Sequence, residues 1–108
     1  MNKEPNCPVH TTLAVIGGKW KPIILWYLQD RTKRFNELNR EIDGITQKML
    51  AQELKQMEKE GLVLRKAYPE IPPRVEYSIT EYGKTLNPLI KSMNDWGSKH
   101  ENRGVSNE

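Results

Sequence analysis

The sequence has very little cysteine and no long apolar segment. Cys7 is the one cysteine in 108 residues, so no internal disulfide can form, and we expect a reducing compartment such as the cytoplasm. No apolar run approaches the roughly 20 residues that a membrane-spanning helix needs. The N-terminal segment, MNKEPNCPVH, also lacks the apolar stretch of a signal peptide. These absences predict a cytoplasmic protein that does not enter a membrane.

Residues suited to catalysis or metal binding are also scarce. The histidines are His10 and His100, and their spacing from Cys7 does not match a metal site. The sequence contains no glycine-rich phosphate-binding loop. A thiol enzyme that used Cys7 would lack a histidine with an orienting partner. We therefore expect no enzymatic activity, no metal and no cofactor.

The charge and the hydrophobic content are moderate. Lys and Arg number 17 against 14 Asp and Glu, which gives a formal net charge of +3. This charge permits nucleic-acid binding without demanding it, so the position of the cations matters more than their sum. Hydrophobic residues make up 36% of the chain, and a chain this short has a thin core. We expect one domain over residues 1–108, with a core over about 7–99, flexible ends, and an oligomer that buries further apolar surface.

Capping residues and periodicity predict five helices and a hairpin. Pro8 suits the first position of a helix that follows Cys7, and Thr46 and Thr80 are good N-caps for later helices. Pro88 falls inside the last helix and should kink or divide it. The expected order is helices 8–16, 19–28, 35–42 and 46–60, strands 62–67 and 75–79, and a helix 80–99, with a short extended link at 32–34. This order predicts a mainly α fold with a small β-hairpin (α+β), in which the third and fourth helices form a helix-turn-helix and the hairpin forms a wing.

The helix expected over residues 46–60 has an uneven distribution of charge. Residues placed at steps of about 100° put Leu50, Leu54 and Met57 on one line, which is the core face. The opposite side carries lysines and no acid, whereas a merely solvated helix usually mixes both signs. Docking in the major groove explains this pattern, since lysines bind phosphates and glutamines read base edges. We therefore predict DNA contacts from Thr46, Gln47, Lys48, Ala51, Gln52, Lys55 and Lys59.

The expected hairpin carries cations around a stiff loop. Its connecting segment, YPEIPPR, has three prolines, and proline cannot pair inside a ladder, so the tip should be rigid and project. Arg65, Lys66 and Arg74 bracket this loop, and an arginine at such a tip suits the negative potential of a minor groove. These residues complete the predicted DNA-binding set, although edge strands also carry charge simply to stay soluble.

Several segments resemble the HxlR-type winged helix-turn-helix transcription regulators, which are relatives of the MarR type. They are CPVHTTLAVIGGKWKPIIL, RFNELNREIDGITQKMLAQELKQMEKEGLV, YPEIPPRVEYSITEYGKTL and LNPLIKSMNDWG. GGKW, RFNEL and PPRVEYSIT are specific in this order and spacing. The resemblance implies a homodimer that binds pseudo-palindromic operator DNA, and we expect a repressor. It also implies that the first and last helices form the dimer interface, here through Thr12, Leu13, Ile16, Leu86, Leu89, Ile90, Met93 and Trp96.

The Cys7-Pro8 pair raises the question of a chemical signal. In members of this family that sense oxidants or electrophiles, a cysteine before proline near the N-terminus does the sensing. An N-cap thiol also faces the positive end of the helix dipole, which favours the thiolate, and Lys3 and Lys19 can add to this effect. Cys7 is thus a redox-sensing candidate, or else it only caps and packs the helix. One cysteine per chain leaves an inter-subunit disulfide, a mixed disulfide with a small thiol, or an adduct as products.

Two other readings of the basic helix face are open at this point. A winged-helix module that grips an acidic protein needs the same charge, and it predicts no sequence-selective binding of DNA. A soluble face sorted by chance gives the same pattern without any partner. No residue points to a small-molecule effector, and the sequence specifies neither the operator nor the signal.

Overall fold

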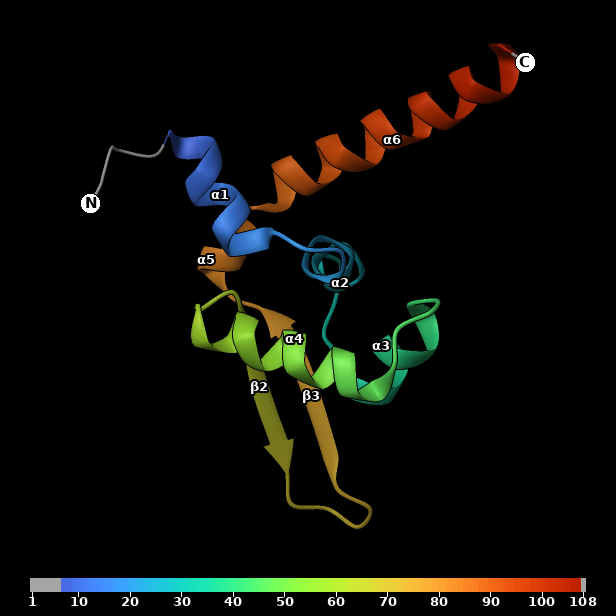
Figure 1. Ribbon diagram of the computed structural model, residues 1–108. Coiled ribbons are helices and arrows are strands. Elements are labelled where there is room, and N and C mark those ends of the chain that lie inside the picture. The colour runs from blue at the N-terminus through green and yellow to red at the C-terminus, as the bar shows by residue number, and fades with distance from the viewer. Residues whose placement is uncertain (1–6, 108) are drawn as a thin grey trace.

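The computed structural model describes residues 7–107. The helices in this range are α1 (Pro8–Ile16), α2 (Trp20–Leu28), α3 (Phe35–Glu41), α4 (Gln47–Lys59), α5 (Glu81–Lys84) and α6 (Asn87–Asn107) (Figure 1). The strands are β1 (Lys33–Arg34), β2 (Val63–Tyr68) and β3 (Arg74–Ile79). A helix-turn-helix followed by a hairpin wing is therefore confirmed. The expected flexible N-terminal end, with Lys3, lies outside the described residues.

The two ends of α4 are fixed by its cap and by its turns. The hydroxyl of Thr46 accepts a hydrogen bond from the Met49 N–H at 3.0 Å, so the predicted N-cap is confirmed. Gly61 follows the other end with a φ of 79°, a left-handed conformation that L side chains rarely adopt. Gly44 has a φ of 87° in the turn between α3 and α4. Both turns that orient α4 therefore depend on glycine.

The wing belongs to a three-stranded antiparallel sheet in the order β1-β3-β2. The sequence predicts only an extended link before α3, but Lys33 pairs with Tyr77 and Arg34 pairs with Glu76. Two residues are too few to show the alternation that identifies a strand, and their partners lie far along the chain. The pairing attaches the start of α3 to the inner strand of the wing.

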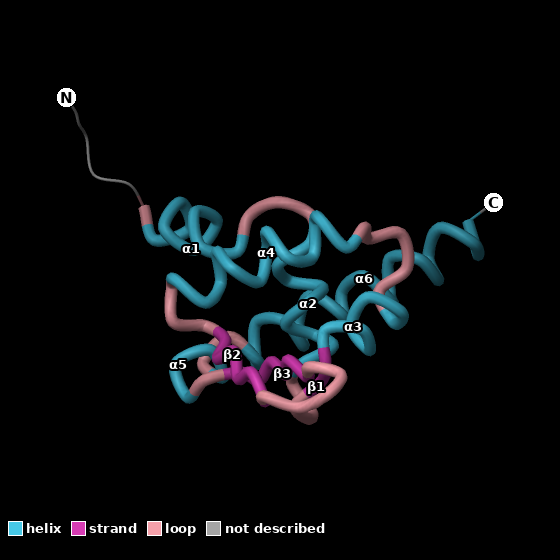
Figure 2. Tube along the Cα trace, turned by 90° about the horizontal axis from the view of Figure 1, so that it is seen from below, coloured by secondary structure: helices cyan, strands magenta, loops and turns pink. Residues whose placement is uncertain are grey.

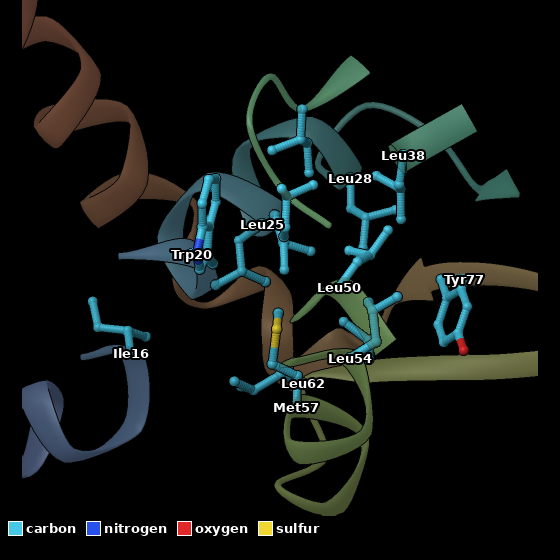
Figure 3. Close-up of a cluster of buried hydrophobic side chains, with 14 of the residues drawn as sticks. Ile16, Trp20, Leu25, Leu28, Leu38, Leu50, Leu54, Met57, Leu62 and Tyr77 are labelled. Atoms are coloured by element: carbon cyan, nitrogen blue, oxygen red, sulfur yellow. The ribbon is translucent and has the colours of Figure 1, made fainter. Parts of the chain in front are cut away.

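The core lies between the sheet and the helices α2, α3 and α4, which Figure 2 shows on one side of the strands. α2 contacts α3, α4, α6 and β3, in agreement with its apolar residues on nearly all sides. Leu50, Leu54 and Met57 of α4 are completely buried, as is Leu25 of α2, and Figure 3 shows them in one cluster. The predicted core face of α4 is therefore confirmed, and its opposite side faces solvent.

The predicted last helix is divided into two. Thr80 caps α5 by accepting a hydrogen bond from the Gly83 N–H at 2.9 Å. α6 begins at Asn87, so Pro88 falls in its first turn, where proline is tolerated. α6 then continues to Asn107, past the expected end at 99, although the polar sequence there predicts a flexible end. Propagation of a helix adds one backbone hydrogen bond per residue, and this segment contains no proline to stop it.

Candidate nucleic-acid interface

The predicted DNA-reading side of α4 is open to solvent along its whole length. The side chains of Gln47 and Lys48 are exposed in the first turn, which contains no acidic residue. The rest of the predicted set on this helix, together with its N-cap, is exposed as well: Thr46, Ala51, Gln52, Lys55 and Lys59. Because the apolar side of the helix is buried, these residues are the ones that a partner of α4 would meet.

The cations on this side of α4 are not neutralised by any residue that the structure describes. None of the ion pairs in the described part of the chain involves Lys48, Lys55 or Lys59. The acid nearest to the centre of the helix, Glu53, instead lies 3.6 Å from the ammonium of Lys21 on α2. This contact holds the carboxylate against the body of the protein, so the exposed side keeps its positive charge.

The two basic residues of β2 lie on opposite faces of the sheet. Side chains alternate along a strand, and Arg65 therefore shares a face with the buried Val63, whereas Lys66 points the other way. The ammonium of Lys66 lies 5.1 Å from the centre of the Tyr68 ring on that outer face. Arg65 makes no ion pair among the described residues and lines a cleft beside the wing. Both remain predicted DNA contacts, but the structure places only Arg65 in a cleft.

This cleft has a volume of about 470 Å³ and lies between the wing and the start of α3. Arg34 and Asn36 line it from the β1–α3 side, opposite Arg65 and the prolines of the wing loop. The sequence prediction contains neither Arg34 nor Asn36, since only the pairing of β1 with β3 brings the RFNEL segment beside the wing. The arrangement offers guanidinium and amide donors, which suit a phosphate group.

Arg74 is held by its own hairpin. Its guanidinium lies 2.7 Å from a carboxylate oxygen of Glu70 and 2.7 Å from one of Glu76. It also lies over the Tyr68 ring, 3.8 Å from the ring centre. The hydrogen bond that Arg74 donates to Glu70 is the main cause that raises the pKa of Arg74, so the group stays charged. Its role in DNA binding stays a prediction, with the charge already compensated by two acids.

The surface of α1 and α6 exposes a row of apolar side chains. Leu13 of α1 is 58% exposed, and on α6 Leu89 is 38% exposed, Met93 45% and Trp96 67%. Of the other residues predicted at the dimer interface, Thr12 and Leu86 are half-buried, while Ile16 and Ile90 are buried in the core of the single chain. Those two residues have almost no surface left for a partner, so the predicted interface narrows to the exposed row.

Cys7 is exposed at the N-cap position of α1. Its carbonyl accepts a hydrogen bond from the His10 N–H at 2.9 Å, and its side chain makes no capping hydrogen bond. The ammonium of Lys19 lies over the Trp20 ring, 4.5 Å from its centre.

Among the described residues there is no group of three potential metal ligands, and no helix there has the length and apolar character to cross a membrane.

Comparison with known proteins places this arrangement in context. Residues 15–105 match the model of the family described as HxlR-like helix-turn-helix. The uncharacterized HTH-type transcriptional regulator YdeP of Bacillus subtilis (strain 168) is 52% identical over 97 residues, which cover 90% of this chain and 76% of that protein.

Solved structures are similar to most of the chain. The redox regulator HypR in its oxidized form has a TM-score of 0.82 at 49% identity, covering 86% of this chain and 96% of that chain. In its reduced form the TM-score is 0.85 at 46% identity, covering 93% and 99%. The reduced form of the transcriptional regulator YodB from B. subtilis has a TM-score of 0.73 at 35% identity, covering 88% and 94%.

Proposed function

The chain belongs to the HxlR-like helix-turn-helix family and is a transcriptional regulator, and from this premise we propose that it is a repressor that binds a pseudo-palindromic operator as a homodimer in the cytoplasm. The observation that carries the proposal is the exposed side of α4, whose lysines have no carboxylate partner in the described part of the chain. A major groove about 12 Å wide admits such a helix. Phosphates then supply the charge that the protein does not.

The α4 residues divide into two groups by their chemistry. Gln47 and Gln52 present an amide donor and acceptor, which can pair with the edge of an adenine. Lys48, Lys55 and Lys59 carry single positive charges that bind phosphates on the two sides of the groove. The glutamines therefore give sequence selectivity in the proposed complex, and the lysines give affinity that depends on salt.

The cleft beside the wing takes a phosphate of the flanking DNA backbone. Arg34, Arg65 and Asn36 are among the residues that line this cleft, and their guanidinium and amide groups are the donors that we propose for the phosphate. A phosphate between two guanidinium groups accepts charge-assisted hydrogen bonds, which are roughly twice as strong as neutral ones. This contact would fix the position of the wing relative to α4.

Dimerisation uses the exposed apolar row of α1 and α6, formed by Leu13, Leu89, Met93 and Trp96. Burying this row against its copy removes apolar surface from water, and a two-fold axis then presents the two α4 helices on the same side of the dimer. Two α4 helices related in this way meet successive turns of the major groove, so the half-sites should lie about 10 base pairs apart.

Hydroxyl-radical footprinting of the DNA upstream of the protein's own gene tests this function. We expect two protected patches on one side of the duplex, separated by about one helical turn. A single patch would contradict the dimeric operator. Uniform protection of this DNA and of a shuffled sequence would leave only charge attraction, which is the behaviour expected of a surface made for an acidic protein.

A redox or electrophile response through Cys7 is the second part of the proposal. It is supported by the exposure of the thiol at the start of α1, and by the similarity to HypR, which is described as a redox regulator. In a dimer, two Cys7 thiols joined as a disulfide lose two protons and two electrons to an added oxidant such as diamide. A small thiol or an electrophile can take the place of the second cysteine.

The test compares DNA binding by wild type and Cys7→Ser before and after diamide, with intact mass measured in parallel. We expect diamide to change the affinity of wild type, together with a shift of its mass, and to leave Cys7→Ser unchanged. Equal responses of the two proteins would exclude a sensing role for Cys7 and would not affect the proposed DNA-binding function.

A further inference from the structure

The tip of the wing carries an apolar side chain that nothing in the described part of the chain covers. Ile71 is 101% exposed, more than any other large hydrophobic residue among those described. It lies in the loop between β2 and β3, at the end of the hairpin farthest from α1 and α6 (Figure 1). Pro69 precedes it and Pro72 and Pro73 follow it, so the loop that presents it is stiff. A stiff loop holds this side chain out at little cost in conformational entropy on binding.

The same tip has no free positive charge to offer. Between the strands the loop contains Glu70 and no lysine or arginine. The arginine at its base, Arg74, is engaged by the carboxylates of Glu70 and Glu76, each at 2.7 Å, and by the Tyr68 ring. An arginine that reaches into a minor groove must first leave these partners. The tip therefore presents a hydrophobic group rather than a cation.

The length of the hairpin matches the spacing of the DNA grooves. β2 and β3 have 6 residues each, so the wing extends about 20 Å at roughly 3.3 Å per residue. With α4 in a major groove, the adjacent minor groove lies about half a helical turn away, or roughly 17 Å. That groove is about 6 Å wide, which admits one side chain and excludes a helix.

We infer that Ile71 is an apolar wedge that enters the minor groove beside each half-site, and that Arg74 is a positioning residue that holds the wedge in place. The inference rests on the proposed function, since it requires α4 in the neighbouring major groove. Apolar side chains inserted between base steps partly unstack them and bend the duplex. Steps such as TA unstack most readily, so Ile71 should favour such a step at positions that no polar group of the protein reads.

The test compares wild type with Ile71→Ser and Ile71→Leu in binding to the DNA upstream of the protein's own gene. Leu64→Ser is the matched control, because Leu64 is also an exposed aliphatic residue of the wing but lies on the outer face of β2, opposite to Val63. We expect Ile71→Ser to lose about tenfold in affinity per half-site, as burial of one isoleucine implies. Ile71→Leu and Leu64→Ser should stay within about twofold of wild type.

A second readout reports insertion itself. The fluorescence of 2-aminopurine rises when it unstacks, so it is placed in turn at each adenine of the minor groove flanking the footprint. Wild type and Leu64→Ser should raise the fluorescence at one position per half-site, and Ile71→Ser should not. Selective DNA binding with no rise at any position, or with full affinity in Ile71→Ser, overturns the wedge and leaves the proposed function intact. No preference of wild type for this DNA over a shuffled sequence overturns the function and the wedge together.

A double-mutant cycle distinguishes two roles of Arg74, the positioning of Ile71 and direct binding of a phosphate. If Arg74 only positions the wedge, Arg74→Ala weakens binding without changing its salt dependence, and Ile71→Ser with Arg74→Ala is no weaker than Ile71→Ser alone. If Arg74 binds a phosphate, its removal lowers the slope of log affinity against log salt by about one per contact, and the two losses add. The additive result would contradict the positioning role.

Discussion

Lys33 of β1 donates a hydrogen bond to Glu41 of α3 across 2.6 Å, and the side chain of Lys33 is 8% exposed. The ammonium also lies 5.5 Å from the centre of the Tyr27 ring of α2. This ion pair joins the edge strand of the wing sheet to the last turn of the first helix of the helix-turn-helix. It therefore ties together the two elements whose relative position matters for the proposed DNA contacts.

Breaking this pair should cost more than breaking an exposed one. Glu41→Ala leaves a buried ammonium without its carboxylate, so we expect a loss of about 1–3 kcal/mol in the free energy of unfolding. Lys84→Ala, which removes the exposed pair with Glu81, should cost less than about 0.5 kcal/mol. Urea denaturation measures both. Equal losses would mean that the burial of Lys33 has no energetic consequence.

Substitution of the lysines and of the glutamines of α4 should have different effects on DNA binding. Lys48→Ala or Lys55→Ala should weaken binding to all DNA sequences and reduce the salt slope by about one per phosphate contact. Gln47→Ala or Gln52→Ala should instead lower discrimination at particular bases by about 1–3 kcal/mol.

Binding titrations over a range of salt separate these effects. The control is Lys91→Ala, which removes a lysine on α6 that pairs with Asp95 at 3.0 Å, away from α4. It should bind DNA as wild type does. Equal losses on every sequence from the glutamine changes would argue against base reading by Gln47 and Gln52.

Trp96 tests the dimer interface. Its indole is 67% exposed and stacks on His100 with ring centres 4.9 Å apart, so it contributes little to the core of one chain. Trp96→Glu should shift the protein from dimer to monomer in sedimentation equilibrium. The monomeric variant should still unfold cooperatively on heating, because Trp96 contributes little to the core of one chain. Leu64→Ser changes an exposed apolar residue elsewhere and should remain dimeric. A dimer that persists in Trp96→Glu would move the interface away from this part of α6.

Glu37 gives the start of α3 a dependence on pH. Its carboxylate accepts a hydrogen bond from the Arg34 N–H at 2.8 Å and one from the Arg31 guanidinium at 3.3 Å. The first contact, and then the second, lower the pKa of Glu37 below its ordinary value. A lowered folded pKa stabilises the fold above the unfolded pKa, and this contribution is lost as pH falls through the folded value.

The measurement is an NMR titration of the Glu37 carboxyl carbon, with urea denaturation from about pH 5 to about pH 3. We expect the Glu37 pKa to lie below the ordinary glutamate value of about 4.3. The stability of Glu37→Gln should fall less with acid than that of wild type. An ordinary pKa in the folded protein would show that neither hydrogen bond persists in solution.

Local signals in the sequence predicted α4 well. The cap at Thr46, the break at Gly61 and the apolar spacing of Leu50, Leu54 and Met57 all lie within one helix, so its bounds and its buried side follow from the chain itself. The same spacing leaves the basic residues on the solvent side, where the structure has them.

These local signals could not predict contacts between residues that are far apart in the sequence. The short strand at Lys33 is defined by its pairing with Tyr77, and the neutralisation of Arg74 depends on how the hairpin folds back on itself. The burial of Ile16 and Ile90 likewise depends on which helices meet in the core. A stripe of apolar residues does not reveal how much of it one chain covers, so the burial of these two residues within the single chain could not be predicted.

Fluorescence anisotropy of the reduced protein with DNA tests directly whether the chain binds a specific operator. The titration compares the DNA upstream of its own gene with a shuffled sequence of the same composition, over a range of salt. A sequence-specific regulator should bind the upstream DNA tightly, and its preference for this DNA should persist as added salt weakens non-specific binding. Equal, weak and steeply salt-dependent binding to both sequences would contradict this prediction.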